Sequence, residues 1–167
     1  MEKVRKIVKK YYLRQIMTYW LACWMFFGLP AQIAMAAPPM NAGNIVPTSQ
    51  TAGVDFLNPI GSDITTVLAP HQAIIEYSNF NVDALKTLHF DQTLATDAVL
   101  NRIIEANPSY LNGNITALGR VFIVNPAGVI FGGGATINVS QLVASGLGMS
   151  NQAFLDATRA FQENIHP

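Results

Sequence analysis

The sequence predicts an all-β protein whose short strands coil into a parallel β-helix. The prediction rests on residues 121–150, where three patterns coincide. Apolar residues recur in pairs separated by one position, as in a short strand with one buried face. Residues that bend the chain follow each pair. The pairs recur at steps of eight, eight and ten residues, which leaves no room for an intervening helix. The pairs are Val121/Ile123, Val129/Phe131, Ile137/Val139 and Leu147/Met149.

Strands this close together form either hairpins or a solenoid that winds in one direction. Hairpin signals such as Asn-Gly between alternating strands are scarce in this stretch. The segments VFIV (121–124) and VIF (129–131) are apolar on both faces, which indicates burial on two sides. We therefore favour the solenoid, with hairpins as the alternative.

The segment Asn125-Pro126-Ala127-Gly128 is the clearest predicted corner. Pro126 fixes φ and removes a backbone donor, and Gly128 can adopt positive φ. Around it the sequence resembles the amino-terminal secretion domain of two-partner secretion exoproteins, the filamentous haemagglutinin type. The family motif is Asn-Pro-Asn-Gly followed by Ile or Val, so Val129 matches and Ala127 departs. Alanine cannot supply the side-chain turn bond of the third Asn, so we expect the turn to depend more on Pro126 and Gly128.

The resemblance covers about residues 72–154 and consists of several segments in the order that the family shows. The segments are AIIEYSNFNV (73–82), LHFDQ (88–92), VLNRI (99–103), NPSYLNG (107–113), GRVFIVNPAGVIFG (119–132), ATINV (135–139) and LVAS (142–145). The fold that this resemblance implies is a right-handed parallel β-helix with short N-terminal capping strands.

The resemblance also implies a function: a non-catalytic export and folding module without a cofactor. Such a chain crosses the inner membrane through the Sec machinery, loses its leader to signal peptidase and is recognised by the periplasmic domains of an outer-membrane transporter. It then folds outside, secreted or at the cell surface. The predicted secretion and folding motif comprises residues 125–129 together with Asn107 and Pro108. The alternative for this motif is a corner with a purely structural role.

Residues 1–36 are predicted to be a signal peptide with a helical core. Six of the ten basic residues precede Gln15, and residues 16–29 form an uncharged apolar run. Ala34-Met35-Ala36 has the small-x-small pattern, so we expect cleavage between Ala36 and Ala37. A retained membrane anchor is the alternative, but the run is shorter than the ~20 residues that a span prefers.

The chain beyond Ala36 is acidic and free of thiols. It carries four Lys and Arg against nine Asp and Glu, a net charge of −5, which disfavours nucleic acid as a partner. The single cysteine, Cys23, leaves with the signal peptide, so no disulfide can form. An exported chain without disulfides can stay unfolded until it reaches the outer membrane.

The mature chain divides into three parts. Residues 37–53 are rich in Pro, Asn, Gly, Ser and Thr and form an extended lead-in. Residues 54–150 form the β-helix domain. Within it, 94–106 also has a helical pattern, but the resemblance makes 98–104 a strand, and Asn107-Pro108 ends either element. Residues 151–167 form a short helix or loop with Ser150 as a cap. Family exoproteins continue for many more turns, so the resemblance implies a truncation point here.

Other chemistry has weak support in the sequence. Asp91 and Asp97 are the only close pair of carboxylates for a polysaccharide-cleaving site, and we expect turn or solvated roles for them. Ser145 lacks a nucleophile-elbow context. We expect no metal site, because the three histidines, His71, His89 and His166, are widely spaced and better suit surface or turn positions.

Two further classes of function stay open from the sequence. One is a surface adhesin or carbohydrate-binding protein, with a host-cell or glycan receptor reached through missing downstream repeats. The remote alternative is a β-helical polysaccharide-active enzyme. Asn114 and Asn138 begin Asn-x-Thr/Ser tripeptides, so sugar attachment there is a further hypothesis.

Overall fold

A computed structural model describes residues 40–163 of the chain, with side chains to residue 161. The predicted signal peptide, the cleavage site between Ala36 and Ala37, and His166 lie outside this part. The described strands are β1 (Ile45–Gln50), β2 (Asp55–Leu57), β3 (Ile64–Leu68), β4 (Ala73–Phe80), β5 (Thr87–Asp91), β6 (Ala98–Ile103), β7 (Ser109–Leu111), β8 (Asn114–Ala117), β9 (Arg120–Val124), β10 (Val129–Phe131), β11 (Thr136–Asn138) and β12 (Gln141–Ser145). One helix, α2 (Asn151–Glu163), follows them.

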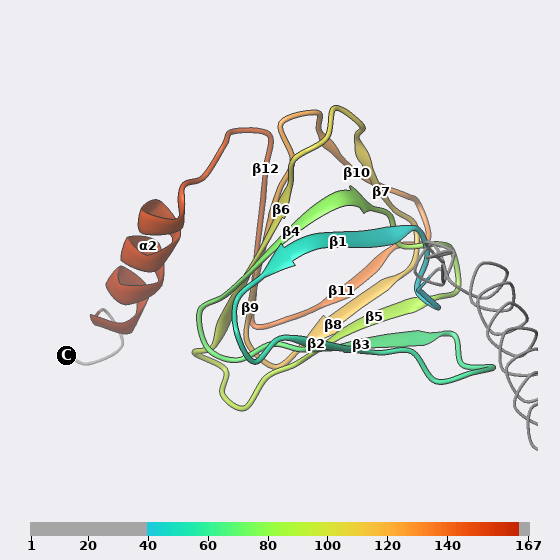
Figure 1. Ribbon diagram of the computed structural model, residues 1–167, viewed down its shortest axis with the longest axis horizontal. Helices are drawn as coiled ribbons and strands as arrows, with labels where there is room; N and C mark the ends of the chain where they lie inside the picture. The colour runs from blue at the N-terminus through green and yellow to red at the C-terminus, as the bar shows by residue number, and fades with distance from the viewer. Residues whose placement is uncertain (1–39, 164–167) are drawn as a thin grey trace, which may run out of the picture. The chain divides into compact units, whose positions relative to one another are not determined.

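The strands stack into three sheets that enclose a triangular core (Figure 1). One sheet has the order β1-β4-β6-β9-β12, the second β11-β8-β5-β3-β2, and the third contains only β10 and β7. From β6 onward the chain visits the first, third and second sheets in turn, and every pairing between rungs is parallel. This confirms the predicted parallel β-helix. The two antiparallel pairings, β1 with β4 and β2 with β3, lie at the N-terminal end as the predicted capping strands.

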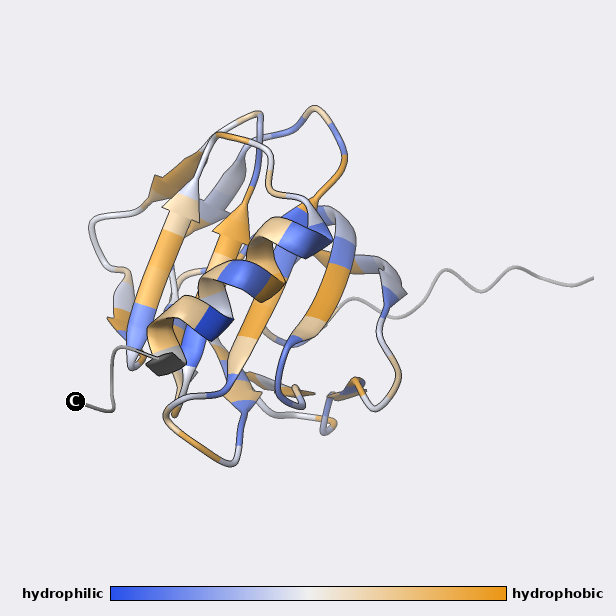
Figure 2. Ribbon diagram, turned by 90° about the vertical axis from the view of Figure 1, so that its left-hand side faces the viewer, coloured by the Kyte–Doolittle hydropathy of each residue, from blue (hydrophilic) through white to orange (hydrophobic). Residues whose placement is uncertain are grey.

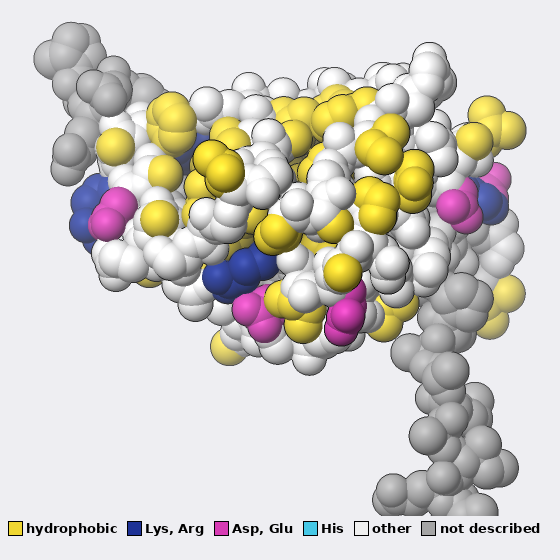
Figure 3. Space-filling model, turned by 90° about the horizontal axis from the view of Figure 1, so that it is seen from above, with side chains coloured by type: hydrophobic (Ala, Val, Ile, Leu, Met, Phe, Trp, Pro, Cys, Tyr) yellow, Lys and Arg dark blue, Asp and Glu magenta, His cyan; other side chains and the backbone are white. Residues whose placement is uncertain are grey.

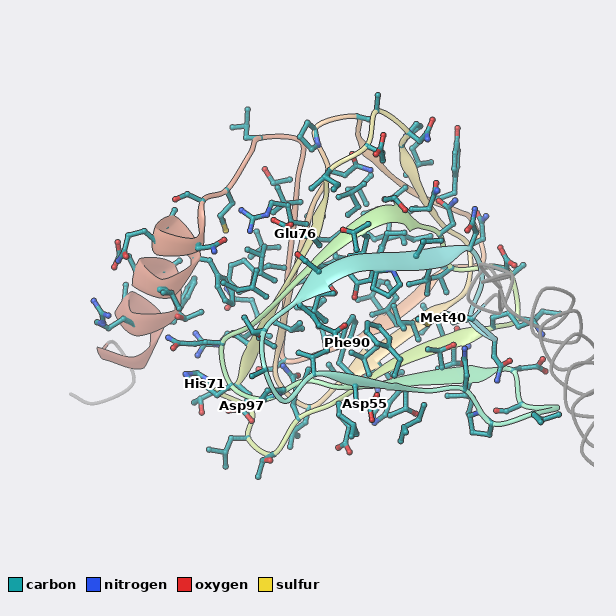
Figure 4. All side chains as sticks on the ribbon, in the orientation of Figure 1. Met40, Asp55, His71, Glu76, Phe90 and Asp97 are labelled. Carbon is teal, nitrogen blue, oxygen red and sulfur yellow. The ribbon has the colours of Figure 1, made fainter. Side chains whose placement is uncertain are left out.

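Equivalent residues of successive rungs stack in register. Ala73 pairs with Val99, Val99 with Val121, and Val121 with Leu142, at separations of 26, 22 and 21 residues. All four belong to the interior apolar core. Phe90 also points into this core from the second sheet (Figure 4). The interior is therefore built from columns of apolar side chains, one from each rung.

The strand β9 confirms the predicted burial on two sides. Val121 and Ile123 face the interior core, whereas Phe122 and Val124 face outward and pack with α2. In Figure 2, α2 lies across the hydrophobic outward face of this sheet. Of the two structures expected beyond residue 150, a short helix or a loop, the chain forms the helix over residues 151–163. Its cap is confirmed as well, since the Ser150 hydroxyl accepts a hydrogen bond from the Ala153 N–H at 3.1 Å.

Three segments can be compared with what the sequence predicts for them. Residues 98–103 are strand β6, which confirms the strand over the helix. The fourth strand of the 121–150 stretch is β12, not the predicted Leu147/Met149 pair, because Leu142 continues the column above Val121. Within the segment expected as an extended lead-in, residues 45–50 form the capping strand β1, whose Ile45 is buried.

The expected burial of VIF (129–131) on two sides is wrong. Ile130 and Phe131 are 45% and 42% exposed. Strand β10 pairs only with β7, and within the described residues no rung stacks on its other side. Tyr110, which pairs with Ile130, is exposed as well. Figure 3 shows hydrophobic side chains gathered on this side of the molecule.

Gly113 offers a direct test of how closely the rungs stack. A Cβ atom at this position would lie 2.2 Å from the Asp83 carbonyl oxygen and 2.5 Å from that of Lys86. We expect Gly113→Ala to lower the free energy of unfolding by about 2 kcal/mol, since backbone must move apart to accept the methyl group. Urea denaturation measures this change. Gly133→Ala is the control, because no atom lies within 4 Å of its added Cβ. An equal loss in both variants would contradict the stacking.

Candidate functional site

The predicted corner connects β9 to β10, and its first residue is completely buried. Asn125 has 0% exposure, whereas Pro126 and Ala127 are exposed. Gly128 has φ +112°, a conformation that side-chain-bearing residues rarely adopt. The Gly128 N–H donates to the Asn125 carbonyl at 2.9 Å and closes the turn. The corner is therefore tight, with one polar side chain inside and two apolar residues outside.

The Asn125 side chain joins its own turn to the preceding rung. Its amide nitrogen donates to the Asn107 carbonyl at 3.0 Å and to the Ser109 hydroxyl at 2.9 Å. Its oxygen accepts the Ala127 N–H at 2.9 Å. On the other side, the Asn125 backbone N–H donates to the Ser145 carbonyl of the next rung at 3.0 Å. A single residue thus contacts three successive rungs.

This geometry corrects one expectation about the turn. The sequence suggested that the turn depends more on Pro126 and Gly128, because Ala127 cannot make a side-chain bond. The side-chain bond comes instead from Asn125, and residue 127 contributes only its backbone N–H. Gly128 does take the expected positive φ. The structure also places Asn107 beside Asn125, while Val129 packs against the core.

Ser109 is the participant that sequence reasoning missed. It is buried beneath the corner and its hydroxyl accepts a hydrogen bond from Asn125. The available signal was the repeated Asn-Pro, at 107–108 and again at 125–126. Two such corners one rung apart lie above each other in a solenoid, which brings the residue after the first corner under the second.

The other residues considered for catalysis or ligand binding have structural surroundings. Asp97 accepts hydrogen bonds from the N–H groups of Thr93 and Leu94 at 3.0 and 2.8 Å, so it closes a turn. It is buried, contrary to a solvated role, whereas Asp91 is exposed at the end of β5. The Ser145 hydroxyl accepts the Leu147 N–H at 3.0 Å, as a corner residue does.

His71 has the exposed turn position that the sequence predicts, whereas His89 does not. His71 lies beside Asp97, with 3.2 Å between its Nδ1 and a carboxylate oxygen (Figure 4), although the two residues are distant in the sequence. His89 is part of strand β5 and lies 2.8 Å from the Thr116 hydroxyl, so it is not a turn residue. Within residues 40–163, no group of three or more His, Cys, Asp or Glu is placed to hold a metal ion. No helix in the same range is long and apolar enough to cross a membrane.

The parallel β-helix, its antiparallel caps and the Asn-Pro-x-Gly corner define a capped β-helical domain. The chain belongs to the TPS secretion domain family, which matches residues 44–166. This confirms the resemblance seen in the sequence. The crystal structure of the HMW1 secretion domain from Haemophilus influenzae is similar, with a TM-score of 0.60 and 28% identity. That similarity covers 66% of this chain and 30% of the HMW1 domain.

Two curated relatives are heme/hemopexin-binding proteins of Haemophilus influenzae. One is 33% identical over 98 residues, which cover 59% of this chain and 11% of the relative. The other is 38% identical over 74 residues, which cover 44% of this chain and 8% of the relative. The chain therefore matches about a tenth of the length of these curated relatives.

The Asn125 side chain should be a major contributor to stability. Asn125→Ala leaves three polar groups without their partner: the Asn107 carbonyl, the Ser109 hydroxyl and the Ala127 N–H. We expect a loss of about 2 to 4 kcal/mol in the free energy of unfolding, measured in urea. Asn138→Ala is the matched control, since Asn138 is exposed in β11. Its expected change is below about 0.5 kcal/mol. Equal effects would show that the buried network contributes nothing.

Proposed function

We propose that this chain is an export module that directs itself to an outer-membrane transporter and begins β-helix folding outside the cell. The observation that carries the proposal is membership of the TPS secretion domain family across residues 44–166. The family implies an outer-membrane partner protein. On this proposal the Sec machinery delivers the chain to the periplasm, signal peptidase cleaves between Ala36 and Ala37, and the product is secreted or held at the cell surface.

The unfolded chain has the properties that recognition by strand addition requires. Strand addition needs extended segments whose backbone N–H and C=O groups are free. In the folded protein these groups pair between rungs, so they are available only before folding. No cysteine follows Cys23, so no disulfide closes a loop in the periplasm. We therefore infer that the transporter binds the chain before its rungs have formed.

The corner suggests how folding outside could proceed in one direction. Asn125 makes its side-chain bonds to Asn107 and Ser109, which precede it in the chain. Its backbone then donates to Ser145, which follows. A rung that has already formed thus provides hydrogen-bond partners for the next, and each new rung opposes backward movement.

Burial separates the proposed roles within the motif 125–129. Asn125 is inaccessible in the folded protein, so its contribution there is structural. Pro126 and Ala127 are exposed and free to contact another protein. The neighbouring corner residue Asn107 is exposed and Pro108 is half-buried. We propose that Asn125 acts in folding and that any recognition of the folded corner involves the exposed residues.

Secretion should depend on the transporter. The chain is produced with and without a candidate outer-membrane transporter of the two-partner secretion type, and culture medium, cell surface and periplasm are assayed separately. We expect the mature chain outside the cell only when the transporter is present, and in the periplasm otherwise. The chain without residues 1–36 is the control and should stay in the cytoplasm. Transporter-independent appearance in the medium, or retention in the periplasm with the transporter, would refute an export function.

Asn125→Ala should separate binding from folding. Because the residue is buried only after folding, we expect the urea-unfolded variant, diluted onto the transporter's periplasmic domains, to bind within about twofold of the wild type. The amount of folded protein outside the cell should fall. Surface plasmon resonance measures binding, and protease resistance of the secreted fraction measures folding. A variant that folds normally but no longer binds would instead assign Asn125 to recognition.

A further inference from the structure

Helix α2 rests on a surface to which all four parallel strands of one sheet contribute. Phe154 is completely buried, and its ring centre lies 5.1 Å from that of Phe122 in an edge-on arrangement. Both belong to an apolar cluster on the outward face of the sheet (Figure 2). The strand residues of this cluster are Ile74 from β4, Ala98 and Leu100 from β6, Phe122 and Val124 from β9, and Val143 from β12. The surface beneath α2 is complete only when these rungs are stacked.

Polar contacts fix both ends of α2 to different rungs. At its beginning, Arg102 of β6 donates to the Met149 carbonyl at 3.0 Å and also to the side chain of Asn151. Near its end, the guanidinium of Arg120 lies 5.4 Å from the centre of the Phe161 ring. Between them, Gln72 donates to the Thr158 hydroxyl at 2.9 Å, across 86 residues of sequence. These contacts too require several rungs to be in place.

The helix has little to stabilise it away from this surface. It is 13 residues long, with no acidic residue in its first turn and no basic residue in its last. Isolated helices of about 12 to 15 residues are marginal in water. Its own support is the Ser150 cap and the side-chain contacts of Asp156 with Gln152 and Arg159. The helix therefore depends on docking, and docking depends on the stack.

We propose that α2 is a clasp that closes last: it docks only after β6, β9 and β12 have paired, and it then slows unfolding of the rungs beneath it. The outward face of the sheet is its binding site, and the assembled stack alone presents that site. Where the rungs fold outside the cell, the clasp also closes outside. That last step rests on the proposed function, whereas the order of docking is a property of the purified chain.

Folding kinetics test the order of docking. A contact that forms after the transition state affects unfolding and leaves folding almost unchanged. We expect Phe154→Ala to raise the unfolding rate about a hundredfold and to change the folding rate less than about twofold in stopped-flow urea jumps. If that variant does not fold, the milder Phe154→Leu gives the same test, with a rise of about tenfold. A slower folding rate with unchanged unfolding, or two unchanged rates, would overturn the clasp.

Two controls separate the clasp from the stack. Gln152 lies on the exposed side of α2, and Gln152→Ala removes only its exposed contact with Asp156, so each rate should change less than about threefold. Ile123→Val alters the interior of the same strand that carries Phe122, and should slow folding.

Pulse-labelling hydrogen exchange on the unmodified chain gives the order of docking directly. Peptides from 151–163 should gain protection after peptides from 98–103 and 120–124, and simultaneous or earlier protection would overturn the proposal. Neither measurement involves the transporter.

Discussion

Pairing of each rung with the one before it is the interaction on which the structure depends. From β3 onward, the parallel partners of each strand lie in another rung, more than twenty residues away in most cases. Contacts so distant in sequence make ordering of the chain costly until a first rung exists. Once it exists, each further rung finds a complete row of backbone partners. The stack therefore becomes easier to extend than to begin, which explains why corners and caps matter so much.

Buried polar side chains determine how the rungs align. The interior column of Ile75 and Ile123 contains Asn101 between them. The Tyr77 hydroxyl donates to the Asn101 oxygen at 3.0 Å, and the Asn101 amide donates to the Phe122 carbonyl at 3.1 Å. Burial also raises the pKa of the Tyr77 phenol well above its usual value. A shift of the strand register by one residue would leave these buried polar groups without hydrogen-bond partners. Apolar stacking alone would not impose that free-energy cost. Asn125 has the same effect at the corner.

Local sequence patterns predicted the strands and the corner. Contacts between residues that are distant in the sequence could not be predicted from such patterns. Alternating apolar residues located β9, and Asn-Pro-x-Gly located the corner after it. Register was not predictable, because it depends on which residues stack across rungs. The apolar spacing therefore predicts a strand at Leu147 and Met149, whereas the fourth strand is β12. The hydrogen bond between Asn125 and Ser109 and the contact between His71 and Asp97 were not predictable for the same reason. Each joins residues that no local pattern connects. The exposure of Phe131 likewise depends on its neighbouring rung and not on its own sequence.

Long-range hydrogen bonds stabilise the stack in a chain that has no disulfides to do so. A disulfide formed in the periplasm would close a loop before export and persist. The bonds from Asn125 to Asn107 and from Gln72 to Thr158 tie together segments 18 and 86 residues apart, but they exist only when the rungs are stacked. An unfolded chain carries none of them and can remain extended. Hydrogen bonds of this kind therefore stabilise the folded protein without constraining the chain from which it forms, as the proposed folding after transport would require.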